Sequence, residues 1–127
     1  KKIENLKAIF SADGPISKTR SNRIAEKGKG IDPKSLLAEH SIVKINEYNG
    51  KKSIYLSPGH VTQLVGVEKK ENEELLKYLF QHQIKPEFIY SFEWEANCIA
   101  IWNNYAILHN PVNDFDDHRV MHRITIQ

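Results

Sequence analysis

The sequence predicts a mainly β fold with covering helices, in the α+β class, and three observations support this expectation. Short runs of alternating apolar and polar residues recur along the chain, as expected of strands with one buried face. Asn-Gly and Asn-Asn turn signals separate several of these runs. One amphipathic run is long enough to form a helix that covers a sheet. Several short strands beneath one helix favour a β-sandwich or jelly roll.

The beginning of the chain is predicted to hold two short helical pieces on either side of a loop. Apolar side chains three and four residues apart share a helical face over residues 3–10 and predict a helix end there. Asp32 followed by Pro33 combines a capping residue with proline at the first helical position, which predicts a short helix running to about residue 39.

A hairpin and a long helix are predicted next. Alternation predicts strands over residues 41–46 and 52–56, and Asn49-Gly50 between them suits the positive φ of a hairpin turn. Residues 69–84 form the best amphipathic helical pattern, with a leucine-rich stripe opposite a charged face. Pro86 is expected to end this helix.

The last forty residues are predicted to be rich in strands. Alternation indicates strands over residues 88–94, 98–102, 105–109 and 119–126. Asn103-Asn104 lies between the second and third of these and is a two-residue hairpin signal. A sheet face built by these strands is expected to pack beneath the helix at residues 69–84.

Length and composition fit one domain covering residues 1–127. Hydrophobic residues make up 40% and charged residues 27%, a mixture typical of globular proteins. No apolar run approaches the roughly 20 residues of a membrane helix. Cys98 is the only cysteine, so a disulfide within the chain and a cysteine-based zinc site are excluded. We therefore expect a cytoplasmic protein without a membrane partner.

Positive charge is concentrated near the beginning of the chain. Residues 1–30 hold eight Lys/Arg and three acidic residues, a net charge of +5, whereas the remaining residues carry −3. A basic stretch can bind nucleic acid. Phe10 is its one aromatic residue, however, and offers little for bases to stack on. We predict a flexible basic loop over residues 11–31 and do not expect nucleic acid as a partner.

Two arginines near the end of the chain are candidates for anion binding. Because side chains alternate along a strand, Arg119 and Arg123 would share one face, about 13 Å apart at Cα at roughly 3.3 Å per residue. A guanidinium binds a carboxylate or sulfonate through two parallel hydrogen bonds. The pattern equally allows each arginine to pair with a nearby carboxylate of Asp114, Asp116 or Asp117.

Several motifs, in order, resemble the taurine dioxygenase family of iron(II)- and 2-oxoglutarate-dependent oxygenases. These motifs are Trp102-Asn103-Asn104, His109, Asn113-Asp114-Phe115 and the run Arg119-Val120-Met121-His122-Arg123. The similarity extends back through Pro58-Gly59 to about residue 36. It implies a double-stranded β-helix, or jelly roll, of which this chain is the C-terminal part.

The resemblance also implies roles for individual residues and for two cofactors. His109 matches the distal histidine of the two-His, one-carboxylate site for Fe(II), and Arg119 matches the arginine that holds 2-oxoglutarate, the cosubstrate. Arg123 matches the arginine that binds the substrate anion. Trp102 matches a tryptophan near the metal pocket, and His60 stands where the taurine enzyme has a phenylalanine. His60 therefore indicates a more polar substrate than taurine, unless it is a surface turn residue.

The implied reaction couples decarboxylation of 2-oxoglutarate to succinate with hydroxylation of a small anionic substrate, a sulfonate or carboxylate. The 127 residues contain no His-x-Asp or His-x-Glu pair, which would supply the other two iron ligands. We therefore expect this chain alone to be inactive and its own binding of Fe(II) and 2-oxoglutarate to be incomplete. The alternative is a non-catalytic truncated jelly roll that binds small anions or forms a homo-oligomer through exposed sheet edges.

Overall fold

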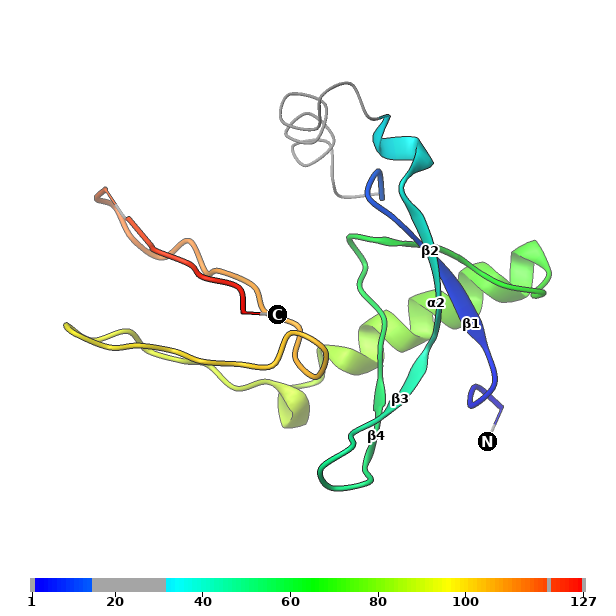
Figure 1. Cartoon of the computed structure of the whole chain (residues 1–127), viewed down its shortest axis with the longest axis horizontal. Coiled ribbons are helices and arrows are strands. Elements are labelled where there is room, and N and C mark those ends of the chain that lie inside the picture. Colours follow the sequence, from blue (N-terminus) through cyan, green and yellow to red (C-terminus); the bar gives the residue numbers. More distant parts are fainter. Residues whose placement is uncertain (1, 15–31, 119, 127) are drawn as a thin grey trace.

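A three-stranded antiparallel sheet, a two-stranded hairpin and one long helix form the body of the protein (Figure 1). The computed structural model describes residues 2–14, 32–118 and 120–126. In the three-stranded sheet, β1 lies between β2 and β5, and β3 pairs with β4. The elements are β1 Lys7–Ser11, the 3-10 helix η1 Pro33–Ser35, β2 Leu37–Ser41, β3 Val43–Ile45, β4 Lys52–Ile54, β5 Val61–Leu64, α2 Lys69–Gln83 and the 3-10 helix η2 Pro86–Phe88.

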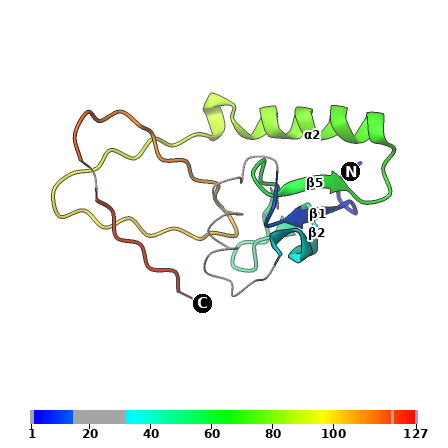
Figure 2. The same ribbon diagram turned by 90° about the horizontal axis from the view of Figure 1, so that it is seen from above.

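Helix α2 covers one face of the three-stranded sheet (Figure 2). Leu76 and Leu79 are its buried residues, and they join one apolar cluster with residues from the sheet and its flanking segments. That cluster consists of Ala8, Ile42, Leu56, Val61, Leu64, Leu76 and Leu79. The Leu64 amide donates a 2.7 Å hydrogen bond to Asn72 Oδ1, which ties the end of β5 to the first turns of α2. Burial of these side chains is the main force that holds the helix on the sheet.

Two predicted elements are confirmed. The hairpin forms with Val43 opposite Ile54 and Ile45 opposite Lys52, and Gly50 has the positive φ, 68°, that the turn signal anticipates. Helix α2 begins at the residue expected and ends at Gln83. Both are encoded by local signals, a turn residue that tolerates positive φ and an apolar stripe of helical period. The mixed helix-and-sheet class is therefore also confirmed.

The helix end predicted for residues 3–10 is wrong, whereas the short helix predicted from Pro33 does begin there, as a 3-10 helix, but ends at Ser35. Residues 3–10 contain β1 where a helix end was expected, and residues 33–39 contain η1 and then the start of β2. β1 pairs on both sides, with β2 and with β5, so its backbone groups are satisfied by segments distant in sequence. Such pairing outweighs the weak helical spacing of three apolar residues. Strand β5 was not predicted. The flexible loop predicted for residues 11–31 falls outside the described residues from position 15 onward.

The strands predicted after residue 88 are also wrong within the described residues. The chain from residue 90 onward makes two long excursions away from the body (Figures 1 and 2). We call residues 90–102 the first arm and residues 108–126 the second arm. No strand is assigned in the described part of either arm, and no closed barrel forms there. The jelly roll therefore stays a prediction.

A close backbone contact next to β1 gives a direct test of the fold. A Cβ added to Gly14 would overlap the Gly59 carbonyl oxygen and approach His60 Cα to 2.8 Å, whereas one added to Gly59 meets nothing nearer than Ser57 Oγ at 3.8 Å. We expect Gly14→Ala to destabilise the protein by about 1–3 kcal/mol, since backbone must shift to admit the methyl group. Gly59→Ala is the matched control, and urea unfolding measures both. Equal stability of the two variants would contradict the close approach.

Candidate functional site

Trp102 and His109, both predicted site residues, are brought together by the turn between the arms. Their ring centroids lie 5.0 Å apart, with the ring planes inclined by 51°. Trp102 Nε1 donates a 2.9 Å hydrogen bond to Asn104 Oδ1. The amides of Ala106 and Ile107 both donate to the Asn103 carbonyl at 3.1 Å. The Asn103-Asn104 signal therefore produces a turn as predicted, although the segments on either side do not pair as strands.

The described residues do not complete a metal site around His109. No group of three or more His, Cys, Asp or Glu side chains converges anywhere in the described part of the chain. His109 is exposed and can contribute one imidazole ligand. One imidazole does not hold Fe(II), which in the two-His, one-carboxylate arrangement needs three protein ligands. The donor set of the described residues thus does not fit iron, and the sequence contains no His-x-Asp or His-x-Glu pair.

The structure describes one of the two candidate anion-binding arginines. Arg119 lies outside the described residues. Arg123 is exposed, and within the described residues it makes no ion pair with Asp114, Asp116 or Asp117. Arg123 therefore does not pair with the aspartates of its own loop, which was the alternative that the sequence allowed. Its guanidinium is available to an external anion.

His60 lies in a tight turn beside a shallow pocket near the end of β1. Its Nδ1 is 2.9 Å from Ser57 Oγ, a hydrogen-bond distance, and its carbonyl accepts a 2.8 Å hydrogen bond from the Ser11 amide. The half-buried imidazole borders a pocket of about 330 Å³ whose other described lining residues are Phe10, Ser11, Ala12, Leu36, Leu37 and Ala38. This lining includes no residue of the arms. The structure therefore does not bring His60 together with Trp102 and His109.

An aromatic cluster that was not predicted as part of the site includes Phe10, which also lines this pocket. Phe10, His40 and Tyr55 lie in mutual contact, with ring centroids 5.3–5.8 Å apart. Lys44 Nζ lies 5.4 Å from the centre of the Tyr55 ring, within the range of a cation–π interaction. A correct strand assignment for β1 would have revealed the cluster, because Ala8 pairs with His40 and Phe10 lies two residues along the same face.

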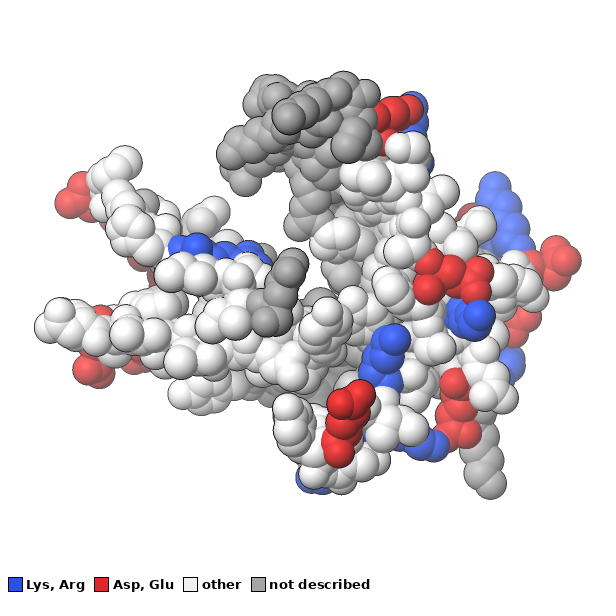
Figure 3. All heavy atoms as spheres, viewed as in Figure 1, with Lys and Arg blue, Asp and Glu red and all other residues white. Residues whose placement is uncertain are grey.

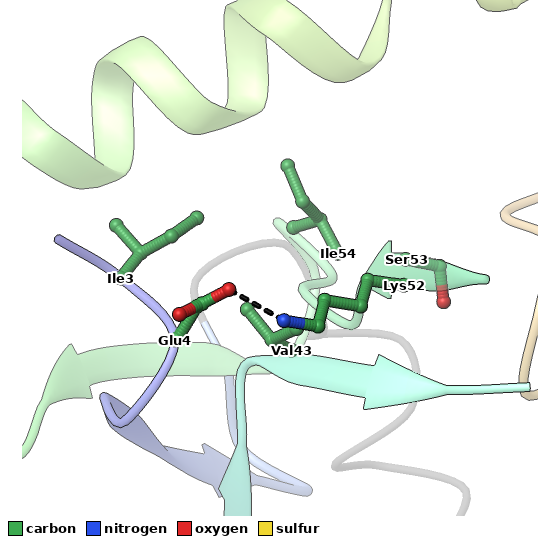
Figure 4. A pocket seen from close by; sticks show the side chains of 6 residues that line it. All are labelled: Ile3, Glu4, Val43, Lys52, Ser53 and Ile54. Carbon is green, nitrogen blue, oxygen red and sulfur yellow. Dashed lines mark hydrogen bonds and ion pairs between the residues drawn. The ribbon is translucent and has the colours of Figure 1, made fainter. Parts of the chain in front are cut away.

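A second pocket, of about 220 Å³, lies between the N-terminal turn and the β3–β4 hairpin (Figure 4). Its two charged side chains point toward each other, with Lys52 Nζ 2.6 Å from Glu4 Oε1. The hydrogen bond and charge of Lys52 lower the pKa of the Glu4 carboxyl from its usual value. Because the two charges neutralise each other, this pocket offers no strong attraction to an anionic ligand.

Two further ion pairs of the body lie on its surface. Lys7 Nζ lies 2.8 Å from Glu39 Oε1 across the β1–β2 pair, and this hydrogen bond and the negative charge of Glu39 raise the pKa of the lysine. Lys2 Nζ lies 3.0 Å from Glu71 Oε1 at the start of α2. These exposed pairs add little stability, as is usual at a surface. Among the described residues, no helix is long and apolar enough to cross a membrane.

Comparison with known proteins adds a family match. The sequence model of the family described as "Taurine catabolism dioxygenase TauD, TfdA family" matches residues 1–125. An alkylsulfatase of Acinetobacter baylyi is 30% identical over 129 residues, which cover 97% of this chain and 40% of that protein. An alpha-ketoglutarate-dependent sulfate ester dioxygenase of Pseudomonas putida is 30% identical over 90 residues, covering 69% of this chain and 29% of that protein.

Solved structures show the same relationship. A taurine dioxygenase from Burkholderia xenovorans superposes with a TM-score of 0.54 and 27% identity, covering 75% of this chain and 28% of that one. A putative alpha-ketoglutarate-dependent 2,4-D dioxygenase from the same organism gives a TM-score of 0.54 and 27% identity, covering 74% of this chain and 35% of that one. The chain thus spans less than half the length of each of these relatives.

Proposed function

Since this chain belongs to the TauD, TfdA family of taurine catabolism dioxygenases, we propose that it forms the C-terminal part of an Fe(II)- and 2-oxoglutarate-dependent dioxygenase that hydroxylates a small organic anion. The observation that carries this proposal is the family match over residues 1–125, which includes His109, Arg119 and Arg123. The cytoplasmic location expected from the sequence stays a prediction.

The proposed roles follow the chemistry of the three side chains. His109 is one ligand of Fe(II), and its contact with the Trp102 ring fixes the orientation of the imidazole. Arg119 binds the distal carboxylate of 2-oxoglutarate through two parallel hydrogen bonds. Arg123 binds the anionic group of the substrate in the same way, and its lack of an ion pair with the carboxylates of its own described loop supports this role.

The substrate class is proposed to be a sulfonate, sulfate ester or carboxylate with an apolar portion. Relatives of this chain are named as an alkylsulfatase and a sulfate ester dioxygenase. The pocket beside His60 is mostly apolar, with an imidazole at its border, so it suits the carbon skeleton of such a molecule together with one polar group. His60 is therefore assigned to substrate binding. Trp102 does not line this pocket, and its assignment to substrate binding rests on the motif match alone.

Catalysis requires ligands that these 127 residues do not supply. No three His, Cys, Asp or Glu side chains of the described residues come together to hold a metal ion, and the sequence contains no His-x-Asp or His-x-Glu pair. We therefore propose that this chain contributes one Fe(II) ligand through His109 and binds the two organic anions through its arginines. It does not retain Fe(II) alone. The alternative, a non-catalytic protein that binds small anions, is favoured by the same incomplete donor set.

The deciding experiment extends the chain upstream through its own reading frame. We expect the extended polypeptide to contain His-x-Asp or His-x-Glu. When Fe(II) and 2-oxoglutarate are added without oxygen, it should develop the visible absorption band of the iron–oxoacid chelate. The 127 residues alone should show no such band. An upstream frame without either motif, or an extended polypeptide that gives no band, would exclude the dioxygenase and leave the anion-binding alternative.

A further inference from the structure

The Phe10 side chain belongs to two features of the body at once. It lines the pocket of about 330 Å³ beside His60, and it packs half-buried against the apolar core cluster. In the β1–β2 register Phe10 lies directly opposite Ala38, which also lines the pocket. Directly opposite residues share one face of a sheet, so the small side chain of Ala38 leaves space open beside the large ring. A change in the Phe10 ring would therefore change the pocket directly.

The sheet is irregular at Phe10. Ile9 pairs with Gln63 of β5, but Phe10 pairs with Val61, so Thr62 is an extra residue in β5. Thr62 Oγ1 donates a 3.2 Å hydrogen bond to the Ile9 carbonyl. A β-bulge of this kind bends the strand and re-aims a neighbouring side chain, and such bulges are frequent beside active sites. The bulge thus lies next to the residue that the pocket and the core share.

Two further rings fix the orientation of the Phe10 ring. The Tyr55 ring stacks on it, with centroids 5.4 Å apart and planes inclined by 28°. The His40 ring lies 5.3 Å from it at an inclination of 73°. Tyr55 is itself held in place, because Lys44 Nζ lies 5.4 Å from the centre of its ring and its amide donates a 2.7 Å hydrogen bond to the Ile42 carbonyl. Neither Tyr55 nor His40 is among the described residues that line the pocket, so both act on it through Phe10.

The pocket suits a short apolar chain. Its volume lies at the lower end of the roughly 300–1,000 Å³ typical of ligand pockets. Apart from His60, its described lining contains no side chain that carries a charge. The space-filling view likewise shows uncharged surface over the first residues of β2, whereas the charged side chains of this face lie at η1, further along the sheet and around the β3–β4 hairpin (Figure 3). An organic anion would therefore place its apolar part inside the pocket and its charged group outside.

We propose that Phe10 determines how long an apolar chain this pocket accepts, and that Tyr55 is a positioning residue that holds the Phe10 ring. The ligand class is a linear alkyl chain that carries an anionic group and is short enough to end against the ring. The inference rests on the proposed function in taking this pocket as the site of the substrate's carbon skeleton, but it needs neither Fe(II) nor 2-oxoglutarate. A smaller or displaced ring would admit more of the chain.

Titration of the full 127-residue chain with ethyl, butyl and hexyl sulfate tests the inference. The amide chemical shifts of Ser11, Leu37 and Ala38 in NMR spectra report binding at the pocket, because these residues line it. Each further methylene that is buried strengthens binding by about fourfold. We expect butyl sulfate to bind several-fold more tightly than ethyl sulfate. The ratio of the affinities for hexyl and butyl sulfate should be near one, because the longer chain has no further space to fill.

Variants on both sides of the pocket should shift this preference in opposite directions. Phe10→Leu should raise the hexyl-to-butyl ratio about tenfold, since the smaller side chain admits two further methylenes. Ala38→Val should lower the advantage of butyl over ethyl sulfate by about fourfold, since it narrows the pocket from β2. Ala38 is exposed and outside the core cluster, so this variant decides the matter if Phe10→Leu does not fold.

The positioning role of Tyr55 has its own pair of variants. Tyr55→Leu removes the ring that stacks on Phe10, and it should raise the hexyl-to-butyl ratio in the same direction as Phe10→Leu. Tyr55→Phe keeps a stacked ring and should retain the wild-type ratio. If Tyr55→Leu also retains the wild-type ratio, Tyr55 does not position Phe10.

Phe80→Leu is the matched control, because Phe80 is also half-buried against the core cluster but is not among the residues that line the pocket. It should lower thermal stability much as Phe10→Leu does and leave the hexyl-to-butyl ratio unchanged. The role of Phe10 is overturned if no alkyl sulfate shifts the lining amides, if the two leucine variants change the ratio alike, or if Ala38→Val leaves the preference unchanged.

This inference and the proposed function fail separately. Chain-length selectivity in the 127 residues, combined with no chelate band in the upstream-extended polypeptide, would support the role of Phe10 and count against the dioxygenase. A chelate band combined with no chain-length selectivity would support the dioxygenase and overturn the role of Phe10.

Discussion

Replacing His109 with alanine in the upstream-extended polypeptide will abolish the absorption band of the Fe(II)–2-oxoglutarate chelate and the oxygenase activity. The imidazole is one of three proposed protein ligands, and two ligands leave Fe(II) weakly held. Changes to residues that merely orient a metal ligand already cost 10–100-fold in affinity. Loss of the ligand itself should therefore weaken Fe(II) binding by more than about 100-fold, measured by anaerobic titration.

His118 supplies the matched control for this experiment. It is an exposed histidine nine residues further along the second arm, and its amide donates a 2.7 Å hydrogen bond to Asp117 Oδ1. His118→Ala should keep both the band and the activity. If the His109 variant retains the absorption band, or if the His118 variant loses it, the assignment of His109 as the iron ligand is wrong.

Alanine substitution at Arg119 and at Arg123 will have large effects on two different ligands. Truncating one partner of a buried, hydrogen-bonded charge pair typically costs about 2–5 kcal/mol, which corresponds to at least about a 30-fold loss of affinity. In the extended polypeptide, Arg119→Ala should raise the dissociation constant of 2-oxoglutarate and leave that of the substrate nearly unchanged. Arg123→Ala should raise the KM for the organic anion and leave 2-oxoglutarate binding nearly unchanged.

Lysine variants separate charge from geometry at both positions. Lysine keeps the positive charge but lacks the planar pair of donors that matches a carboxylate or sulfonate. We expect Arg119→Lys and Arg123→Lys to recover only part of the lost affinity, each for its own ligand. If both alanine variants weaken the same ligand, or if neither weakens any, the assignment of the two arginines to separate anions fails.

Local sequence signals predicted the elements that depend on nearby residues. The apolar stripe of α2 and the Asn49-Gly50 turn of the β3–β4 hairpin both have the structures expected. The turn at Asn103-Asn104 also forms, and it places the His109 ring beside Trp102. Each of these features is specified within a few residues of the chain, so periodicity and turn chemistry are sufficient to identify it.

The order of several motifs along the sequence identified the family. The Trp102, His109 and Arg119–Arg123 motifs led to the taurine dioxygenases, and the family match confirms the relationship. The same sequence contains no His-x-Asp or His-x-Glu pair. The family and the lack of a His-x-Asp or His-x-Glu pair were thus both readable from residue identity alone.

Only the tertiary structure decided whether β1 and the two arms form strands. β1 is a strand because β2 and β5, some 30 and 50 residues further along the chain, satisfy both of its edges, and no local pattern carries that information. The arms show the converse, since they alternate as strands do but form none among the described residues. A strand is completed by hydrogen bonds to another segment, so the sequence of one segment can favour it but the presence of its partner determines whether it forms.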